Sequence, residues 1–328
     1  MSFIDHVRAQ ARANPRRIVL PEGVDERTLV AAAHLAKDRL AIPTVLGGPE
    51  VEEELARLGA GGVAVTNPVT DPRRAALANR LYERRKAKGM TEEDALRYSD
   101  DILVFGSLLV GAGEMDGCVS GAINTTGDVL RAALWAVGPA PGIRTVSSSF
   151  YMVVPDFRGR GTEVLTYADA AVVPDPTAEQ LADIAVAAAD SRRRVVGDDP
   201  RVAFLSYSTK GSAEGASIDK VRQALEIFRQ KAPGVPVDGE MQGDAALIES
   251  VGQRKSPGSP VAGNANVLIF PDLDAGNIAY KLTQRLTPGA EAVGPIVQGL
   301  ARPCNDLSRG STPEDIVNVV CITGLLAG

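Results

Sequence analysis

A hydroxyl, a guanidinium and a carboxylate stand close together near the end of the chain. Ser308 and Arg309 precede the flexible Gly310, and Asp315 follows just before the apolar run 316–326. An arginine beside a helix N-terminus can bind phosphate, and a serine hydroxyl can donate a hydrogen bond to a developing oxyanion. These residue types in this order could therefore form a site for acyl or phosphate transfer.

The same stretch also has the pattern of an ordinary helix start. Thr312 is a preferred N-cap, Pro313 suits the first helical position, and acidic residues favour the positive end of a helix dipole. Asp315 stands at the third helical position, from which a carboxylate can bond back to the cap. The pattern alone thus favours a structural Asp315, whereas capping does not require Arg309 and leaves an anion site there open.

Short apolar segments alternate with amphipathic ones through the first half of the chain, which predicts a parallel sheet covered on both faces. Residues 116–122 have the pattern of a buried strand, and a helix is expected over 129–137. Ligands of open parallel sheets bind beyond the carboxyl ends of strands, where Asn124, Thr125, Thr126 and Arg131 are expected to lie. The alternative is a capped helix with Arg131 on a solvated face.

Later segments yield further expectations. The pattern of residues 72–88 predicts a long basic helix. A strand is expected over residues 202–207, and residues 238–244 are expected to lead into a helix. Lys210 lies in a Gly/Ser loop after the strand expected over residues 202–207. It could contact an anion, or it could be an ordinary exposed lysine. Gly294-Pro295 predicts a turn, and residues 138–142 a crossing between domains.

Composition narrows the class of protein. A chain of 328 residues, 45% hydrophobic and 23% charged, suits two globular domains. The net charge of −6 gives no general attraction to nucleic acid, and no apolar run has membrane length, so we expect a cytoplasmic protein. Three cysteines without CxxC spacing and only His6 and His34 predict no disulfide framework, no metal site and no histidine-based triad.

Several stretches together resemble the phosphate acetyltransferase (phosphotransacetylase) family and its phosphate butyryltransferase relatives. The resemblance covers essentially the whole chain and implies the short, catalytic-domain-only form. The matching segments are residues 20–23, 116–122, 174–182, 205–212, 238–244, 256–273, 276–281 and 294–315.

This resemblance implies the reversible reaction of acetyl-CoA with phosphate to give acetyl phosphate and CoA. It implies two three-layer α/β domains of the isocitrate/isopropylmalate dehydrogenase type, with the site in the cleft between them. The first domain is expected over residues 1–145 and 300–328, and the inserted second domain over 146–299. A homodimer is also implied, with coenzyme A as a substrate, no tightly bound cofactor and no metal.

The resemblance also implies roles for single residues. Ser308, Arg309 and the base Asp315 are expected to be catalytic. Arg131 and Arg85 match further functional arginines, although Arg84 lies beside Arg85 and a shift of one residue would exchange them. The expected substrate-binding set for phosphate and CoA is Arg131, Arg85, Asn124, Thr125 and Lys210.

The sequence also leaves other functions and mechanisms open. A ping-pong route through Cys304 would need an activating base, and no histidine is nearby in sequence. A phosphate butyryl- or propionyltransferase would share every motif, because one methylene changes specificity by only ~1–3 kcal/mol. A non-catalytic module that binds acyl phosphate or CoA is another alternative. A dehydrogenase is weakened because Gly111-Ala-Gly113 lacks the third glycine of a dinucleotide loop.

Overall fold

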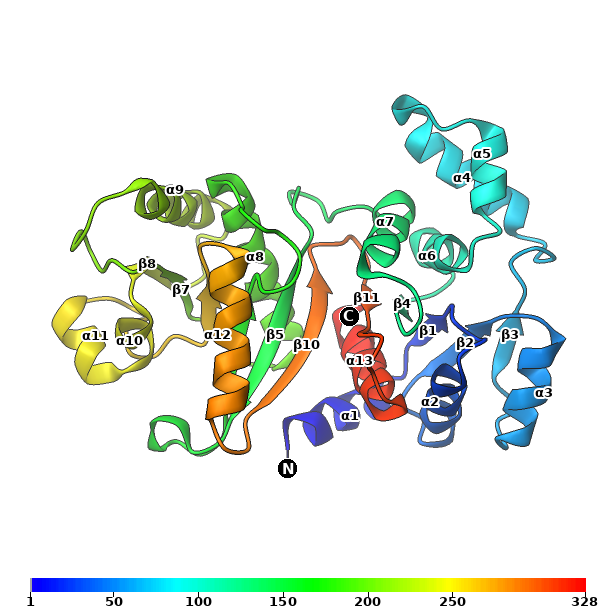
Figure 1. The fold of residues 1–328 in the computed structure, drawn as a ribbon, viewed down its shortest axis with the longest axis horizontal. Helices are drawn as coiled ribbons and strands as arrows, with labels where there is room; N and C mark the ends of the chain where they lie inside the picture. Colours follow the sequence, from blue (N-terminus) through cyan, green and yellow to red (C-terminus); the bar gives the residue numbers. More distant parts are fainter. Residues whose placement is uncertain (1) are drawn as a thin grey trace. The chain divides into compact units, whose positions relative to one another are not determined.

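The computed structural model describes residues 2–328 and divides into two compact units (Figure 1). The first unit comprises the chain up to Ala140 together with Leu300–Gly328, and the second comprises Pro141–Gly299. Within the described residues, every helix is too short or too polar to cross a membrane. Each unit is built on its own sheet, so the expected α/β class with two sheets is confirmed.

The sheet of the first unit has five strands, all parallel, as the alternating pattern predicted. Its strands are short, and β1 and β2 at its centre are rich in Val, Ile and Leu, as expected of strands covered on both faces. In spatial order they are β11 (Cys304–Asp306), β4 (Gly117–Ser120), β1 (Arg17–Leu20), β2 (Ile42–Leu46) and β3 (Ala64–Thr66). The two strands nearest the Ser308 motif, β11 and β4, thus lie side by side.

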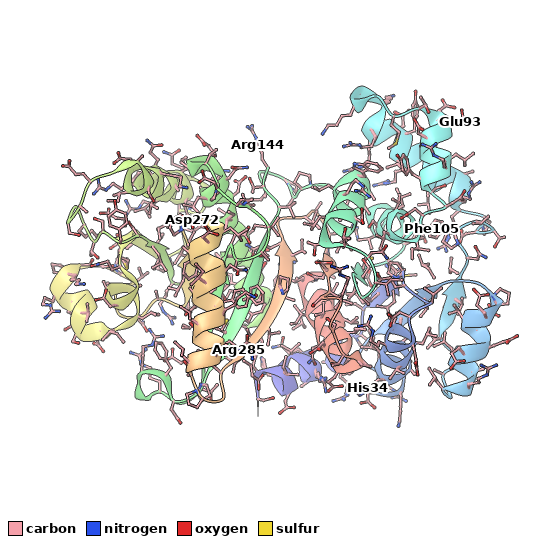
Figure 2. All side chains as sticks on the ribbon, in the orientation of Figure 1. His34, Glu93, Phe105, Arg144, Asp272 and Arg285 are labelled. Carbon is pink, nitrogen blue, oxygen red and sulfur yellow. The ribbon has the colours of Figure 1, made fainter. Side chains whose placement is uncertain are left out.

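Helices cover both faces of this sheet. One buried cluster joins Val19 of β1 to α4 (Arg74–Arg85), α5 (Glu92–Tyr98), α6 (Ile102–Ala112) and α7 (Thr126–Ala136), with Phe105 inside it (Figure 2). On the opposite face, α13 (Pro313–Leu326) packs against α1 (Phe3–Ala13) and α2 (Glu26–Lys37), with α3 (Pro49–Arg57) beside α2. A 3₁₀ turn, Lys86–Lys88, follows α4, so the long basic helix predicted over 72–88 is confirmed in part.

The sheet of the second unit has six strands. Its order is β10 (Glu291–Gln298), β5 (Ser147–Val154), β6 (Glu163–Ala168), β9 (Val267–Ile269), β7 (Val202–Leu205) and β8 (Val237–Met241). The first two pairings are antiparallel and the others parallel. One face packs on α8 (Ala178–Val195) and α9 (Ala216–Lys231). The other packs on α10 (Gly243–Leu247), α11 (Glu249–Lys255) and α12 (Leu273–Leu286).

One local prediction is wrong, and one strand was not predicted. The expected turn at Gly294-Pro295 lies inside the edge strand β10, at a shift of register between Val293 and Ile296. Proline is tolerated at such a place because an edge strand does not need every N–H for pairing. Residues 238–244 lead into helix α10 as expected, but most of them form the buried strand β8, which the sequence pattern had not indicated.

Candidate active site

The Ser308 motif forms a tight turn between the end of β11 and the start of α13. The Ser311 N–H donates to the Ser308 carbonyl at 2.9 Å, and the Gly310 N–H donates to Ser308 Oγ at 3.2 Å. Ser308 and Arg309 are exposed. The guanidinium of Arg309 makes no ion pair or hydrogen bond with the residues described, so its charge is available to an anion.

The predicted cap of α13 is confirmed as a capping box. Asp315 N–H donates to Thr312 Oγ1 at 3.2 Å, while Asp315 Oδ2 accepts from the Thr312 N–H and Oγ1, each at 2.8 Å. The carboxylate is exposed, and its other oxygen, Oδ1, has no hydrogen-bond partner in the described part of the chain. One oxygen of Asp315 thus holds the helix start, and the second is free for chemistry.

Arg27 ties this turn to the loop that follows β4. Its Nη1 donates to the carbonyls of Arg309 at 2.8 Å and Ser311 at 3.0 Å, and its Nη2 donates to the Ala122 carbonyl at 2.8 Å. Asp25 accepts from Nε and Nη2 of the same guanidinium, and this bond raises the pKa of Arg27. The clamp fixes two loops that lie far apart in sequence.

Glu22 organises the loop from the inside. Its carboxylate is buried and accepts from the N–H groups of Gly121, Ala122, Ile123 and Asn124 at 2.7–3.1 Å. Asn124 adds its side-chain amide at 2.8 Å. Asn124 is therefore partly committed to holding the loop, although the sequence had placed it in the substrate-binding set.

Thr125 caps α7, and Arg131 lies in the second turn of that helix. Thr125 Oγ1 accepts from the Asp128 N–H at 3.2 Å and donates to the Asp128 carboxylate at 2.7 Å. Arg131 Nη2 donates to Asp128 Oδ1 at 2.6 Å, and the bonds from Thr125 and Arg131 together lower the pKa of Asp128. Arg131 is exposed, as the alternative reading of a solvated face expected.

Arg85 and Arg131 both lie against the ring of Trp135. Their guanidinium carbons are 5.2 Å and 5.9 Å from its centroid, within the range of cation–π attraction. Tyr98 meets the same ring edge-on at 5.0 Å. A pocket of about 250 Å³ opens here, lined by Tyr98, Asp101, Leu103, Val104, Asn124, Asp128, Arg131, Ala132 and Trp135.

Arg84 and Arg85 differ in what they bind. Arg84 donates to the carbonyls of Trp135 at 3.2 Å and Val137 at 2.8 Å, so it caps the end of α7. Burial, with the charges of Arg80 and Arg85, lowers the pKa of Arg84. Arg85 Nε is buried without a hydrogen-bond partner in the described chain. Of the two, Arg85 is the arginine with unused donors beside the pocket.

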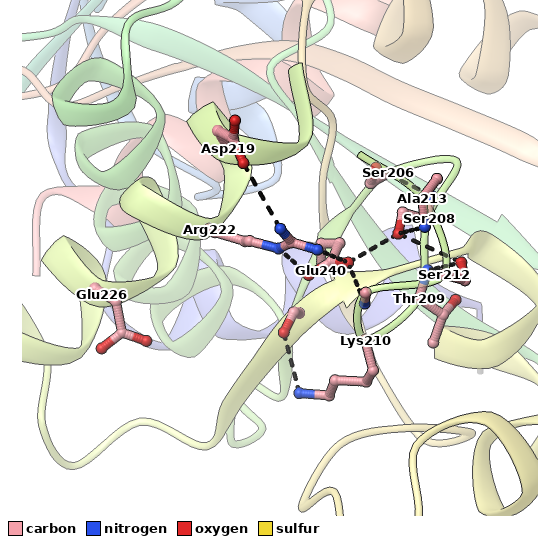
Figure 3. A network of polar contacts seen from close by, with 12 residues as sticks. Ser206, Ser208, Thr209, Lys210, Ser212, Ala213, Asp219, Arg222, Glu226 and Glu240 are labelled. Atoms are coloured by element: carbon pink, nitrogen blue, oxygen red, sulfur yellow. Dashed lines mark hydrogen bonds and ion pairs between the residues drawn. The ribbon is translucent and has the colours of Figure 1, made fainter. Parts of the chain in front are cut away.

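Lys210 belongs to the second unit and is held by its own neighbours. Its ammonium pairs with Asp238 and donates to the Gly239 carbonyl at 3.0 Å. The surrounding loop is fastened by buried Glu240, which accepts from Ser208 Oγ, the Gly211 N–H and Arg222 (Figure 3). Burial alone would raise the pKa of Glu240, but these donors lower it to about 2. The contacts of Lys210 are those of a structural ion pair.

Comparison with known proteins identifies the family. The model of the family described as Phosphate acetyl/butaryl transferase matches residues 2–324. The chain belongs to this family. A phosphate acetyltransferase of Acetivibrio thermocellus is 47% identical over 328 residues, which cover 100% of this chain and 98% of the relative.

Solved structures agree with this assignment. A phosphotransacetylase from Streptococcus pyogenes superimposes with a TM-score of 0.92 at 42% identity, covering 100% of this chain and 99% of that one. A 4-hydroxythreonine-4-phosphate dehydrogenase from Klebsiella pneumoniae has a TM-score of 0.53 at 13% identity, with coverage of 96% and 100%. The latter likeness concerns the fold alone, and it matches the dehydrogenase-like architecture expected from the resemblance.

Features that suggested other chemistries have structural explanations in this member of the family. Cys304 is buried next to Cys118 on the neighbouring strand, where contact with Cys304 and burial raise the pKa of the Cys118 thiol. Gly111 and Gly113 end α6, with Gly113 in the left-handed cap position. Among residues 2–328, no group of three or more His, Cys, Asp or Glu side chains could hold a metal ion.

Three residues of this transferase fold were missed as parts of the site: Glu22, Arg27 and Asp306. Glu22 lies two residues after the end of β1 and Asp306 ends β11, so both stand at carboxyl ends of parallel strands, which is a usable signal. Apart from its pairing with Asp25, Arg27 carries no local signal, because the carbonyls that it links are about 95 and 280 residues away.

Proposed function

We propose that this chain catalyses the reversible transfer of an acetyl group between CoA and inorganic phosphate. The CoA thiolate attacks the carbonyl carbon of acetyl phosphate in a ternary complex, the C–S bond forms, and phosphate leaves with the electrons of the C–O bond. The observation that carries this proposal is the Ser308–Arg309 turn with Asp315 behind it. It stands in a chain 47% identical, over its full length, to a phosphate acetyltransferase.

Asp315 is the proposed base. The thiol of CoA must lose its proton before attack, because the thiolate is the nucleophile. Asp315 Oδ2 stays bound to Thr312, and Oδ1 accepts the thiol proton. Free thiols and aspartates have pKa values of about 8.5 and 3.9. Bound substrates exclude water from the site. Loss of water raises the pKa of a carboxyl group, which narrows the difference between the pKa values of the base and the thiol.

Ser308 and two arginines handle the negative charge. The Ser308 hydroxyl accepts only a backbone N–H in the turn, so its proton can be donated to the acetyl oxygen as that oxygen becomes an oxyanion. Arg309 binds the phosphate with a guanidinium that has no competing carboxylate among the described side chains. Arg131 assists with donors that it does not use on Asp128.

The pocket beside Trp135 is the proposed site for the nucleotide end of CoA. Trp135 and Tyr98 offer aromatic surface, and Arg85 offers a charged group with an unused donor. Asn124 lines the pocket, and Thr125 stands beside it at the start of α7. Lys210 remains a proposed anion contact only if an incoming phosphate displaces it from Asp238.

The finer parts of the proposal rest on the family. Acetyl is proposed over propionyl and butyryl because the relative described above, which is 47% identical over 328 residues, is a phosphate acetyltransferase. We also propose that the protein is a homodimer and that it lies in the cytoplasm, where CoA thioesters are used. Retention of Ser308, Arg309 and Asp315 favours an enzyme over a non-catalytic module that only binds acyl phosphate or CoA.

The direct test is thioester formation from CoA and acetyl phosphate, and its phosphate-dependent reversal. Ser308→Ala is expected to lower turnover by ~10²–10³, the usual cost of losing one oxyanion donor. Arg309→Gln should raise the KM for acetyl phosphate. Arg302→Gln, an exposed arginine before β11, serves as a matched control with normal kinetics. Binding of CoA by a wild-type protein that forms no thioester would favour the non-catalytic module instead.

A further inference from the structure

Asp306 is a buried carboxyl group whose charge has no evident structural use. It ends β11, two residues before Ser308, and only 3% of its surface is exposed. Its Oδ2 accepts from Thr126 Oγ1 at 2.6 Å, whereas its Oδ1 is buried without a hydrogen-bond partner in the described residues. An unpaired buried carboxylate oxygen is costly and rare, so its presence calls for a reason.

Packing explains the shape of this side chain but not its charge. A Cβ placed on Gly121, whose φ is +112°, would come within 2.3 Å of Asp306 Oδ1. The carboxyl group therefore lies directly against the loop backbone that Glu22 holds from the other side. An asparagine has nearly the same shape and would fill this space, so the packing does not require an ionised group.

The hydrogen bond from Thr126 to Asp306 joins two elements of the candidate site. Thr126 is the first residue of α7, directly after Asn124 and Thr125, and Arg131 lies in the second turn of the same helix. On the other side, the Leu307 N–H continues the ladder to the Ser120 carbonyl at 2.8 Å and leads the chain to Ser308. The Thr126–Asp306 bond thus connects the helix that carries Arg131 to the strand that ends at the Ser308 turn.

We propose that Asp306 is a positioning residue for acetyl transfer, whose ionised carboxylate holds the start of α7 against the Ser308–Arg309 turn. This inference rests on the proposed function. Hydrogen bonds to an ionised acceptor are about twice as strong as neutral ones, so the charge stiffens the link. The stiff link keeps Arg131 and Arg309 at a constant spacing around the bound phosphate. Small displacements of such groups can cost on the order of 10² in rate.

Protonation of Asp306 should loosen this link in mild acid. Burial, together with the negative charge of Glu22, raises the pKa of Asp306 to about 6. The other ionisable groups on its own strand and on the elements packed around it are Cys304 on β11, Cys118 on β4, Asp128 and Arg131 on α7, and Glu314, Asp315 and Cys321 on α13. Asp128 and Arg131 pair with each other. Turnover is therefore expected to fall as the pH drops through about 6.

Burial of Asp306 should affect stability in the opposite direction from turnover. A carboxyl group whose pKa is higher in the folded than in the unfolded state favours folding in acid, and this contribution is lost as the pH rises through about 6. Ionised Asp306 therefore destabilises the native state at neutral pH. Asp306→Asn should keep or raise the melting temperature at pH 7.5 while it lowers turnover. A merely structural Asp306 would show the reverse.

The test compares Asp306→Asn, Thr126→Val and the double variant with wild type. Turnover, the KM values and the melting temperature are measured from about pH 5 to 8. The expected results are a 10- to 100-fold fall in kcat at pH 7.5 and loss of the acid limb near pH 6 in Asp306→Asn. Thr126→Val should lower kcat similarly, and the double variant should be no slower than the slower single variant.

A matched control removes a carboxylate from the other end of β4. Asp116 directly precedes that strand and pairs with Arg17 at 2.7 Å, so Asp116→Asn should keep the kcat and the acid limb of wild type. Wild-type kcat with an intact acid limb in Asp306→Asn would overturn the inference. So would a lower melting temperature with unchanged kcat. Absence of acetyl transfer in the wild-type protein would instead refute the proposed function.

Discussion

Asp315 has two separable tasks in this account, and a pair of variants can measure each one. Thr312→Ala removes the hydroxyl that accepts from the Asp315 N–H and donates to its Oδ2, but it keeps the carboxylate. Asp315→Asn removes the charge and the proton acceptor, while the amide oxygen can still accept from the Thr312 N–H. The first variant should act on stability and the second on turnover.

The magnitudes follow from the contacts of the cap. Loss of a Thr N-cap costs about 0.5–2 kcal/mol of unfolding free energy, and Asp315→Asn should cost only the exposed helix-dipole term of about 0.3–1 kcal/mol. A lost general base lowers turnover by about 10²–10⁴, which corresponds to about 3–5 kcal/mol in activation free energy. The kinetic effect of Asp315→Asn thus exceeds its effect on stability several-fold.

The assay records thermal unfolding and CoA-dependent thioester formation for both variants under the same conditions. Thr312→Ala should melt earlier, by about 2–4 °C per kcal/mol, with kcat within a few-fold of wild type. Asp315→Asn should melt near wild type with kcat reduced at least 100-fold. Full turnover in Asp315→Asn, combined with a lower melting temperature, would show that the carboxylate is a helix cap and nothing more.

Three further predictions concern other parts of the chain. Arg85→Ala should raise the KM for CoA with little change in stability. Arg84→Ala should lower the melting temperature, because two carbonyls at the end of α7 lose their donor. Equal changes in the KM for CoA in the two variants would contradict this difference. Cys304→Ser should retain turnover, and an inactive but folded variant would revive the covalent route. Glu240 has a folded-state pKa of about 2, below the usual value, so its contribution is present above about pH 4.5 and is lost as the pH falls toward 2. Acid unfolding followed by circular dichroism should therefore depend less on pH over this interval in Glu240→Gln, and an unchanged dependence would argue against the ion pair with Arg222.

Much of the fold was predictable because its signals are local. The apolar strands β1 and β2 and the capped helix α8 follow from short-range patterns, and their order implies parallel pairing. The strand β8 was missed because Asp238 and Glu240 interrupt its apolar pattern. Their charges are buried only because Lys210 and Arg222 pair with them, and sequence alone does not show these partners.

The site was predictable where chemistry and position coincide. The Ser308 turn and the α13 cap follow from adjacent residues, and both are present in the structure. The contacts of Arg27 with the Ser308 turn and the bond between Thr126 and Asp306 join residues that lie far apart in the sequence. The spacing of residues along the chain therefore does not predict them. The choice between Arg84 and Arg85 likewise depended on which guanidinium reaches the carbonyls at the end of α7.

The central claim is direct transfer between CoA and phosphate at the Ser308–Asp315 segment. Exchange of labelled phosphate into acetyl phosphate tests it most directly, with and without CoA. In a ternary-complex mechanism, labelled phosphate can enter only through acetyl-CoA, so the account predicts exchange that requires CoA and is at least 100-fold slower in Asp315→Asn. Exchange without CoA would show an acyl-enzyme intermediate, and no exchange with CoA present would contradict the proposed activity itself.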